Sequence, residues 1–62
     1  MGMDPKPSLY RPKDAAVILG VSRTMVYDLM RDGLLPYVRI GADRRIRAVD
    51  LTAYIDSLAV NR

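Results

Sequence analysis

The chain has 62 residues, contains neither cysteine nor histidine, and carries a formal net charge of +3. A chain of this length forms one small domain at most and buries only about 60% of its unfolded surface, so we expect marginal stability. The missing residue types exclude disulfides, thiolate metal sites and histidine-dependent catalysis. A carboxylate-only active site stays open in principle. The chain is too short to enclose a pocket, however, so we expect neither enzyme activity nor a cofactor or metal.

The first residues show no periodic pattern. Residues 1–8 place two prolines among polar side chains, which predicts a disordered tail, and Leu9 and Tyr10 are the first candidates for packing. This segment lacks the apolar core of a signal peptide, and no apolar run approaches the length of a membrane span, about 18 residues. We therefore expect a cytoplasmic protein with no membrane partner.

A first helix is predicted from Pro12 or Lys13 to Leu19. Proline suits the first helical position because its missing N–H would be unpaired there. Gly20 suits the left-handed residue that ends a helix. Arg11 would be the N-cap, and arginine is a poor capping residue, so we expect a frayed start.

A second helix follows a tight turn and runs from its cap residue, Ser22, to Gly33. The Ser22 hydroxyl can accept a backbone N–H, and Pro36 blocks any continuation. The buried stripe has the spacing i, i+3, i+4 and consists of Val26, Leu29 and Met30. The opposite face carries Thr24, Asp28 and Arg31, flanked by Met25 and Tyr27. This stretch alone leaves open both a DNA-binding helix-turn-helix and an ordinary pair of packed helices.

After Pro36 the apolar period changes to two, which predicts a β-hairpin with strands at residues 37–40 and 44–47 and a turn at 41–43. Val38, Ile40 and Ile46 are expected on the face turned toward the helices. Arg39, Arg45 and Arg47 are expected to point away from it. Such a hairpin is a wing on a helix-turn-helix, and the alternative is a solvated charged edge that discourages aggregation. Lysine and mixed charges would serve that alternative better than arginine.

The whole net charge lies in this hairpin. Residues 37–47 hold four arginines against Asp43, and the basic and acidic residues elsewhere balance. Arginine suits bidentate contacts to phosphates and base edges, and it suits narrow minor grooves. The placement of charge therefore favours the DNA-binding alternative.

The last predicted element is a helix over residues 49–59, and residues 60–62 are expected to fray. Its core stripe is Leu51, Tyr54, Ile55 and Leu58. Asp50 lies in the first turn, as a cap or as an acid that complements the helix dipole. The predicted domain thus spans residues 9–59 and is mostly α with a small β-hairpin, a winged helix-turn-helix in the order helix, helix, hairpin, helix.

The ordered set of motifs resembles the excisionase-type DNA-binding domain, a compact winged relative of the MerR DNA-binding domain. The resemblance covers about residues 9–58. Its residues are Arg11-Pro12-Lys13-Asp14-Ala15-Ala16, Leu19-Gly20-Val21-Ser22-Arg23-Thr24, Val26-Tyr27, Leu29-Met30, Gly33-Leu34-Leu35-Pro36, Val38-Arg39-Ile40-Gly41, Arg45-Ile46-Arg47, Asp50-Leu51 and Tyr54-Ile55. The family usually has threonine or serine where this chain has Arg11.

The resemblance implies a recombination directionality factor of a phage or integrative element, without catalytic activity. Such a protein binds attachment-site DNA, often cooperatively, bends it, and directs a tyrosine-type integrase toward excision. The implied partners are double-stranded DNA, the integrase and further copies of the protein along the DNA, with nucleoid association when bound. In solution we expect a monomer.

The resemblance also assigns the DNA-binding residues. Those of the recognition helix, for the major groove, are Ser22, Arg23, Thr24, Tyr27, Asp28 and Arg31. Those of the wing, for the minor groove and phosphates, are Arg39, Gly41, Arg44, Arg45 and Arg47. Because Asp28 would repel phosphate, it either accepts from a cytosine or holds Arg31 or Arg23 in place, and we favour the second role.

Two other functions remain. The first is a small transcriptional regulator of a mobile element. MerR-type regulators carry a long dimerisation helix after the DNA-binding domain and often sense a ligand, whereas this chain stops near Leu58, so we expect no small-molecule effector. The second belongs to a different class: a protein-interaction module whose arginine wing docks on an integrase.

Overall fold

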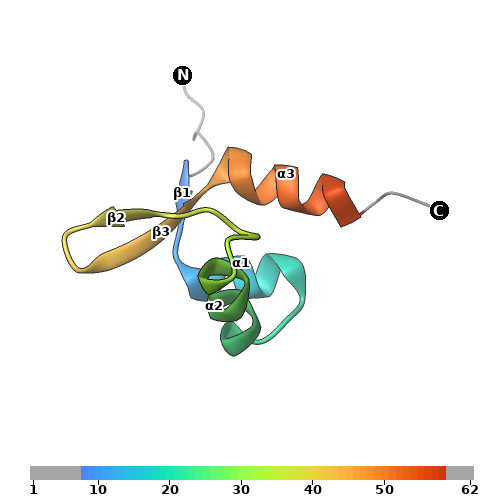
Figure 1. Ribbon diagram of the computed structural model, residues 1–62, viewed down its shortest axis with the longest axis horizontal. Coiled ribbons are helices and arrows are strands. Elements are labelled where there is room, and N and C mark those ends of the chain that lie inside the picture. The colour runs from blue at the N-terminus through green and yellow to red at the C-terminus, as the bar shows by residue number, and fades with distance from the viewer. Residues whose placement is uncertain (1–7, 59–62) are drawn as a thin grey trace, which may run out of the picture.

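The computed structural model describes residues 8–58. The predicted frayed end (60–62) and the predicted disordered tail (1–8), apart from Ser8, lie outside the described residues. The prediction of disorder is wrong at Ser8, whose carbonyl accepts from the Ala48 N–H. The elements in chain order are β1 (Leu9–Tyr10), α1 (Pro12–Leu19), α2 (Arg23–Arg31), β2 (Val38–Ile40), β3 (Asp43–Arg47) and α3 (Ala48–Leu58) (Figure 1). None of the helices in residues 8–58 has the length and apolar character that a membrane span requires.

The turn between α1 and α2 is formed as the sequence predicts. Gly20 has a φ of 73°, and its N–H donates to the carbonyl of Val17 while the N–H of Val21 donates to that of Ala16. This pair of bonds is a Schellman motif, which satisfies carbonyls at the helix end. Ser22 then caps α2, because its Oγ accepts from the Met25 N–H at 3.1 Å.

The ends of α1 and α2 also follow from local sequence. α1 begins at Pro12 after Arg11, whose side chain makes no capping hydrogen bond. α2 ends in a second Schellman motif at Gly33, with φ 78°, where the Leu34 N–H donates to the carbonyl of Leu29.

The sheet has three antiparallel strands in the order β1-β3-β2. Leu9 and Tyr10 form its edge strand, which pairs with Arg47 and Ile46 and was not predicted as a strand. The Ser8 carbonyl extends this edge by accepting from the Ala48 N–H at 2.8 Å. The hairpin is therefore anchored at its base by the segment before α1.

The predicted faces of the hairpin are wrong in part. Val38 pairs with Arg45, and Arg39 pairs with Arg44. Paired residues in an antiparallel ladder share a face, so Val38 lies with Arg45, whereas Arg39 lies with Arg44 and Ile46. Ile40 follows Val38 and likewise does not share the face of Ile46.

Loop length explains the difference. The turn contains only Gly41 and Ala42, because Asp43 pairs with Ile40 as the first residue of β3. Gly41 has a φ of 63°, and no non-glycine residue in 8–58 has a positive φ, which is the pattern of a type II′ turn. A two-residue loop pairs even-numbered residues of one strand with odd-numbered residues of the other. The predicted face, which holds Val38, Ile40 and Ile46, requires even-numbered residues to pair with even-numbered residues, and therefore a loop of odd length.

The core lies where α1, α2, β3 and the first half of α3 meet. Its buried side chains are Ala15, Ala16, Val26, Leu29, Met30, Leu35, Ile46 and Leu51. The predicted stripe of α2 is confirmed, and the small residues of α1 allow α2 to approach closely. Leu35 is fully buried and was not predicted, because it follows α2 in a segment without periodicity.

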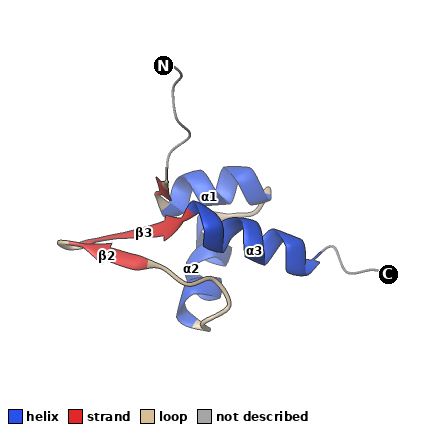
Figure 2. Cartoon of the chain, turned by 90° about the horizontal axis from the view of Figure 1, so that it is seen from above, coloured by secondary structure: helices blue, strands red, loops and turns tan. Residues whose placement is uncertain are grey.

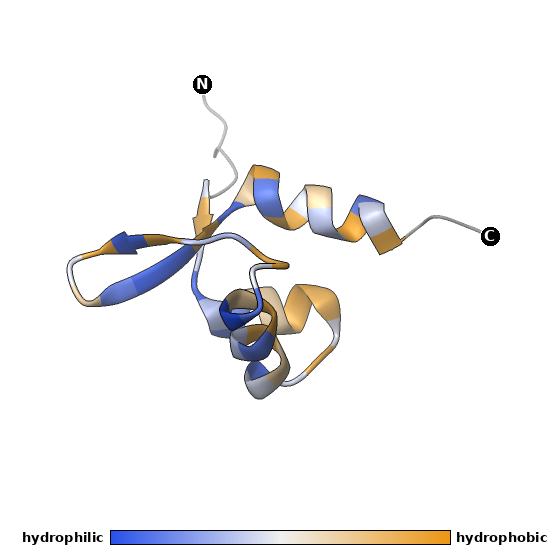
Figure 3. Ribbon diagram, viewed as in Figure 1, coloured by the Kyte–Doolittle hydropathy of each residue, from blue (hydrophilic) through white to orange (hydrophobic). Residues whose placement is uncertain are grey.

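The predicted core stripe of α3 is only half correct. Leu51 is buried and Tyr54 is half-buried, but Ile55 is 38% exposed and Leu58 is 62% exposed. Figures 1 and 2 both show α3 extending from one side of the helix pair, while β2 and β3 extend from the opposite side. The second half of α3 therefore has no described element beneath it, and hydrophobic colour remains on its last turn in Figure 3.

Candidate nucleic-acid interface

The N-terminus of α2 is exposed. The Ser22 cap fixes the first turn, and the next two residues, Arg23 and Thr24, are both exposed. Free backbone N–H groups and the helix dipole make such an end a favourable place for a phosphate. The predicted positions at this end are thus available to a ligand.

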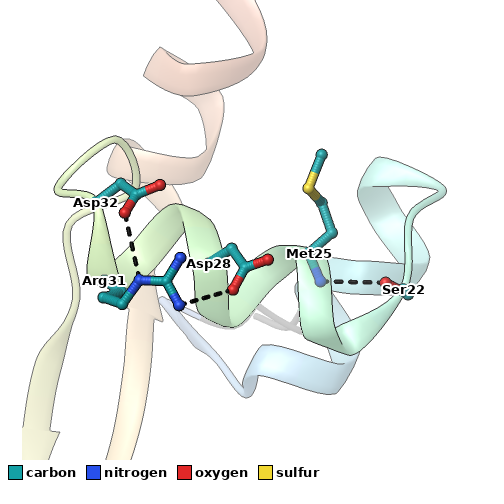
Figure 4. Close-up of polar contacts among 5 residues, drawn as sticks. All are labelled: Ser22, Met25, Asp28, Arg31 and Asp32. Atoms are coloured by element: carbon teal, nitrogen blue, oxygen red, sulfur yellow. Dashed lines mark hydrogen bonds and ion pairs between the residues drawn. The ribbon is translucent and has the colours of Figure 1, made fainter.

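Arg31 is held between two carboxylates at the other end of α2. Its Nη1 lies 3.0 Å from Oδ1 of Asp28, and its Nε lies 3.4 Å from Oδ1 of Asp32 (Figure 4). The sequence favoured a pair between Asp28 and either Arg31 or Arg23, and the partner is Arg31. Its side chains are exposed, so the pair contributes only about 0.3–0.5 kcal/mol and leaves Arg31 able to exchange a carboxylate for a base or phosphate.

Tyr27 links α2 to the wing. The guanidinium carbon of Arg44 lies 4.9 Å from the centroid of the Tyr27 ring and 5.8 Å from that of Tyr37. Both distances allow a cation–π interaction, which needs a cation within about 6 Å of the ring centroid. Tyr37 was not among the predicted site residues. The sequence feature that could have identified Tyr37 is its position directly before the wing.

The remaining wing residues differ in their partners. Arg39 and Gly41 are exposed, and Gly41 lies in the turn at the tip. Arg45 is half-buried, with its Nη2 3.6 Å from Oδ2 of Asp43 and its Nη1 donating to the carbonyl of Arg44 at 3.1 Å. Arg45 is therefore less accessible than a solvent-facing wing residue would be.

Arg47 lies at the base of the wing and binds the first turn of α3. Its Nε and Nη2 donate to the two carboxylate oxygens of Asp50 at 2.7 and 3.2 Å. The hydrogen bond to Asp50, together with the charge of that carboxylate, raises the pKa of Arg47 above its ordinary value. This bidentate pair joins β3 to α3, and it competes with the DNA contact predicted for Arg47.

A cleft of about 480 Å³ lies between the starts of α1 and α2 and the tip of the wing. Five cationic side chains and one carboxylate contribute to its lining: Arg11, Lys13, Arg23, Arg44, Arg45 and Asp43. Tyr27, Pro12 and Ala42 complete it. The cleft is the place where α2 and the wing share one surface.

The helix-turn-helix domain family matches residues 9–59, which is nearly the whole chain. The chain belongs to this helix-turn-helix domain family. It is also similar to the uncharacterized protein YvgK of Bacillus subtilis (strain 168), with 34% identity over 55 residues. That alignment covers 89% of this chain but only 18% of YvgK. No solved structure matches the chain.

The helix-turn-helix domain brings only part of the predicted set into the cleft. Arg23, Tyr27, Arg44 and Arg45 line it, whereas Ser22, Thr24, Asp28, Arg31, Arg39, Gly41 and Arg47 do not. Arg11 and Lys13 line it and were not predicted as site residues. The sequence feature that could have identified them is Arg11 itself, which is a cation at a position where a capping side chain is expected.

Chemically, this helix-turn-helix domain offers cations, hydroxyls and the exposed ring of Tyr27. Among residues 8–58, no group of three or more carboxylate, histidine or cysteine side chains could hold a metal ion. The site is thus equipped to bind an anionic polymer and to read base edges, and these are the capacities of a DNA-binding surface.

Proposed function

We propose that this protein binds duplex DNA sequence-specifically, with α2 in the major groove and the β2–β3 wing in the adjacent minor groove. One observation carries the proposal: the exposed face of α2 and the arginine-rich wing meet at a single cationic cleft, where Arg44 lies over Tyr27. This contact joins the two elements. Membership of the helix-turn-helix domain family supports the same conclusion.

Seven of the predicted residues then have a role in this pose. Thr24 and Tyr27 face base edges, and Arg31 is placed to pair bidentately with a guanine when it leaves Asp28. Ser22 and Arg23 contact a phosphate at the start of α2. At the tip of the wing, Gly41 allows close approach, and Arg39 enters or lines the minor groove.

We further propose that the protein acts as an excisionase. In this role it bends attachment-site DNA, binds cooperatively as several copies, and contacts a tyrosine-type integrase so that excision is favoured. The support is the resemblance of residues 9–58 to excisionase domains and the matched family, which includes excisionase-like proteins. No catalytic group is needed, because the bend and the contacts bias a reaction that the integrase performs.

The test is a selection from a randomised duplex pool, followed by gel shifts of the selected sequences across a concentration series. Direct repeats that fill cooperatively, together with a bend measured on circularly permuted fragments, are the expected results. A single shifted band on an inverted repeat would instead indicate a dimeric transcriptional regulator. Failure to bind any duplex at low salt would contradict DNA binding and leave the interaction module that docks on an integrase.

A further inference from the structure

The cationic cleft contains two cations that neither the recognition helix nor the wing supplies. Arg11 and Lys13 come from the start of α1, and both are exposed. They face Arg23 of α2 and the tip of the wing across the same space. The cleft's one carboxylate, Asp43, is paired with Arg45, so it does not neutralise the cations of α1.

Arg11 occupies a position that serves folding poorly. It is the N-cap of α1, with extended backbone (φ −73°, ψ 155°), and its side chain makes no capping hydrogen bond. A serine hydroxyl in this conformation would accept from a backbone N–H of the first turn. α1 lacks the stabilisation that this hydrogen bond would provide. The stability of the helix therefore does not explain an arginine at position 11.

The proposed pose supplies one. With α2 in the major groove and the wing in the adjacent minor groove, one sugar-phosphate strand separates the two elements. That strand has to cross the space between α2 and the wing tip, and this space is the cationic cleft. Phosphates on the strand would then lie between the cations of α1 and those of α2 and the wing.

We infer that this phosphodiester strand binds in the cleft and that Arg11 and Lys13 make α1 a third DNA-binding element. The inference rests on the proposed DNA-binding function and adds residues to it. These contacts are with phosphates, so they add affinity for every sequence and no discrimination between sequences. Arginine at position 11 suits the role because its planar guanidinium can bind a phosphate through two parallel hydrogen bonds.

Arg11→Ser, Lys13→Gln and the double variant test the inference, with Thr52→Glu as control. Thr52 is exposed on α3, and its replacement changes the net charge by the same single unit as each single variant. Affinity for a selected duplex and for an unrelated duplex is measured across a salt series. Thermal unfolding of each variant is followed in parallel.

Arg11→Ser should raise the melting temperature by about 4–8 °C, because it adds a helix cap. The same variant should weaken binding to both duplexes by equal factors. Each lost phosphate contact should reduce the log–log salt slope by about 0.9, and the double variant by about twice that. Thr52→Glu should leave the slope unchanged. A purely structural role for Arg11 cannot produce this combination of a stabler domain and weaker binding.

Two outcomes would overturn the inference. If the wild-type protein binds duplex with a steep salt slope, and the double variant keeps that slope, the strand does not pass over α1 although DNA binding stands. If inorganic phosphate shifts the backbone amide signals of Arg11 and Lys13 while the double variant binds duplex normally, the cleft binds a free anion instead. If wild-type protein binds no duplex at all, the proposed function itself fails.

Discussion

Arg44 lies over the ring of Tyr27 and joins the wing to α2, with 4.9 Å between the guanidinium carbon and the ring centroid. Arg44 shares the face of Ile46 because the two residues are two apart in β3. The two-residue turn places Arg39 opposite Arg44 on that face. With a turn of odd length, Val38 and Ile40 would lie on that face in place of Arg39. The composition of the proposed DNA-binding surface thus follows from the register of a short hairpin.

A double-mutant cycle at this contact should show a coupling of about 0.5–1 kcal/mol, the range for an exposed cation–π pair. Tyr27→Leu and Arg44→Gln would be measured singly and together by urea unfolding. Tyr27→Phe is the control, since it keeps the ring and loses only the hydroxyl. Additive single effects would contradict a direct interaction between the two side chains.

Leu34 and Leu35 are two adjacent leucines whose substitution tests the boundary of the core. Leu35 is fully buried and Leu34 is 59% exposed, although they are adjacent. Leu35→Ala should cost about 2–5 kcal/mol, which is comparable to the total stability of about 3–9 kcal/mol expected of a domain of this size. Circular dichroism should therefore show Leu35→Ala largely unfolded and Leu34→Ala nearly unchanged. Similar losses for the two variants would mean that the core boundary lies elsewhere.

The sequence predicted those parts of the fold that depend on neighbours along the chain. The Gly20 turn, the Ser22 cap and the buried face of α2 were all expected, because each is fixed within a few residues. Leu35 was missed because no periodicity marks it. The predicted faces of the wing were wrong because Asp43 was assigned to the turn. One extra loop residue moves every side chain of a strand to the opposite face relative to its partner strand.

The candidate site was predicted in the same uneven way. The α2 positions and the wing arginines could be named from the resemblance to excisionase domains, with which residue type and spacing agree. The Arg44–Tyr27 contact, the role of Tyr37 and the cleft with Arg11 and Lys13 arise only when segments distant in sequence meet. The pairing of Arg47 with Asp50 likewise depends on α3 following β3 without an intervening loop.

Gly41→Ala should destabilise the wing by about 1–2 kcal/mol, because alanine disfavours the left-handed backbone that Gly41 adopts. A Cβ at this position would meet no atom within 4 Å, so the cost is conformational and not steric. Ala42→Gly serves as the control, since Ala42 has no positive φ. Unfolding in urea measures the difference, and equal effects at the two positions would contradict the type II′ turn.

Arg47→Gln should weaken DNA binding less than Arg44→Gln, although both remove one positive charge from the wing. Asp50 already binds the guanidinium of Arg47 through two hydrogen bonds, whereas Arg44 has no ion pair among residues 8–58. Anisotropy titrations with one duplex would compare the variants. Equal losses would show that DNA displaces Asp50 from Arg47.

The same pair makes a prediction for pH. Because Asp50 raises the pKa of Arg47, the stability that this arginine contributes is fully present below its unfolded pKa and is lost only as the pH rises through the folded pKa. Both values lie far above neutrality. The difference in melting temperature between wild type and Arg47→Gln should therefore stay constant from neutral into moderately alkaline buffer, and a steady decline there would contradict the assignment.

The central claim is that α2 reads sequence while the wing supplies general affinity. The most direct test is the ratio of affinities for a selected duplex and a scrambled one, measured for wild type, Thr24→Ala and Arg45→Ala. Wild type should prefer the selected duplex by about 10³-fold or more, Thr24→Ala should lose a large part of that preference, and Arg45→Ala should weaken both duplexes alike. A wild-type ratio near one, or a Thr24→Ala ratio equal to that of wild type, would contradict the account.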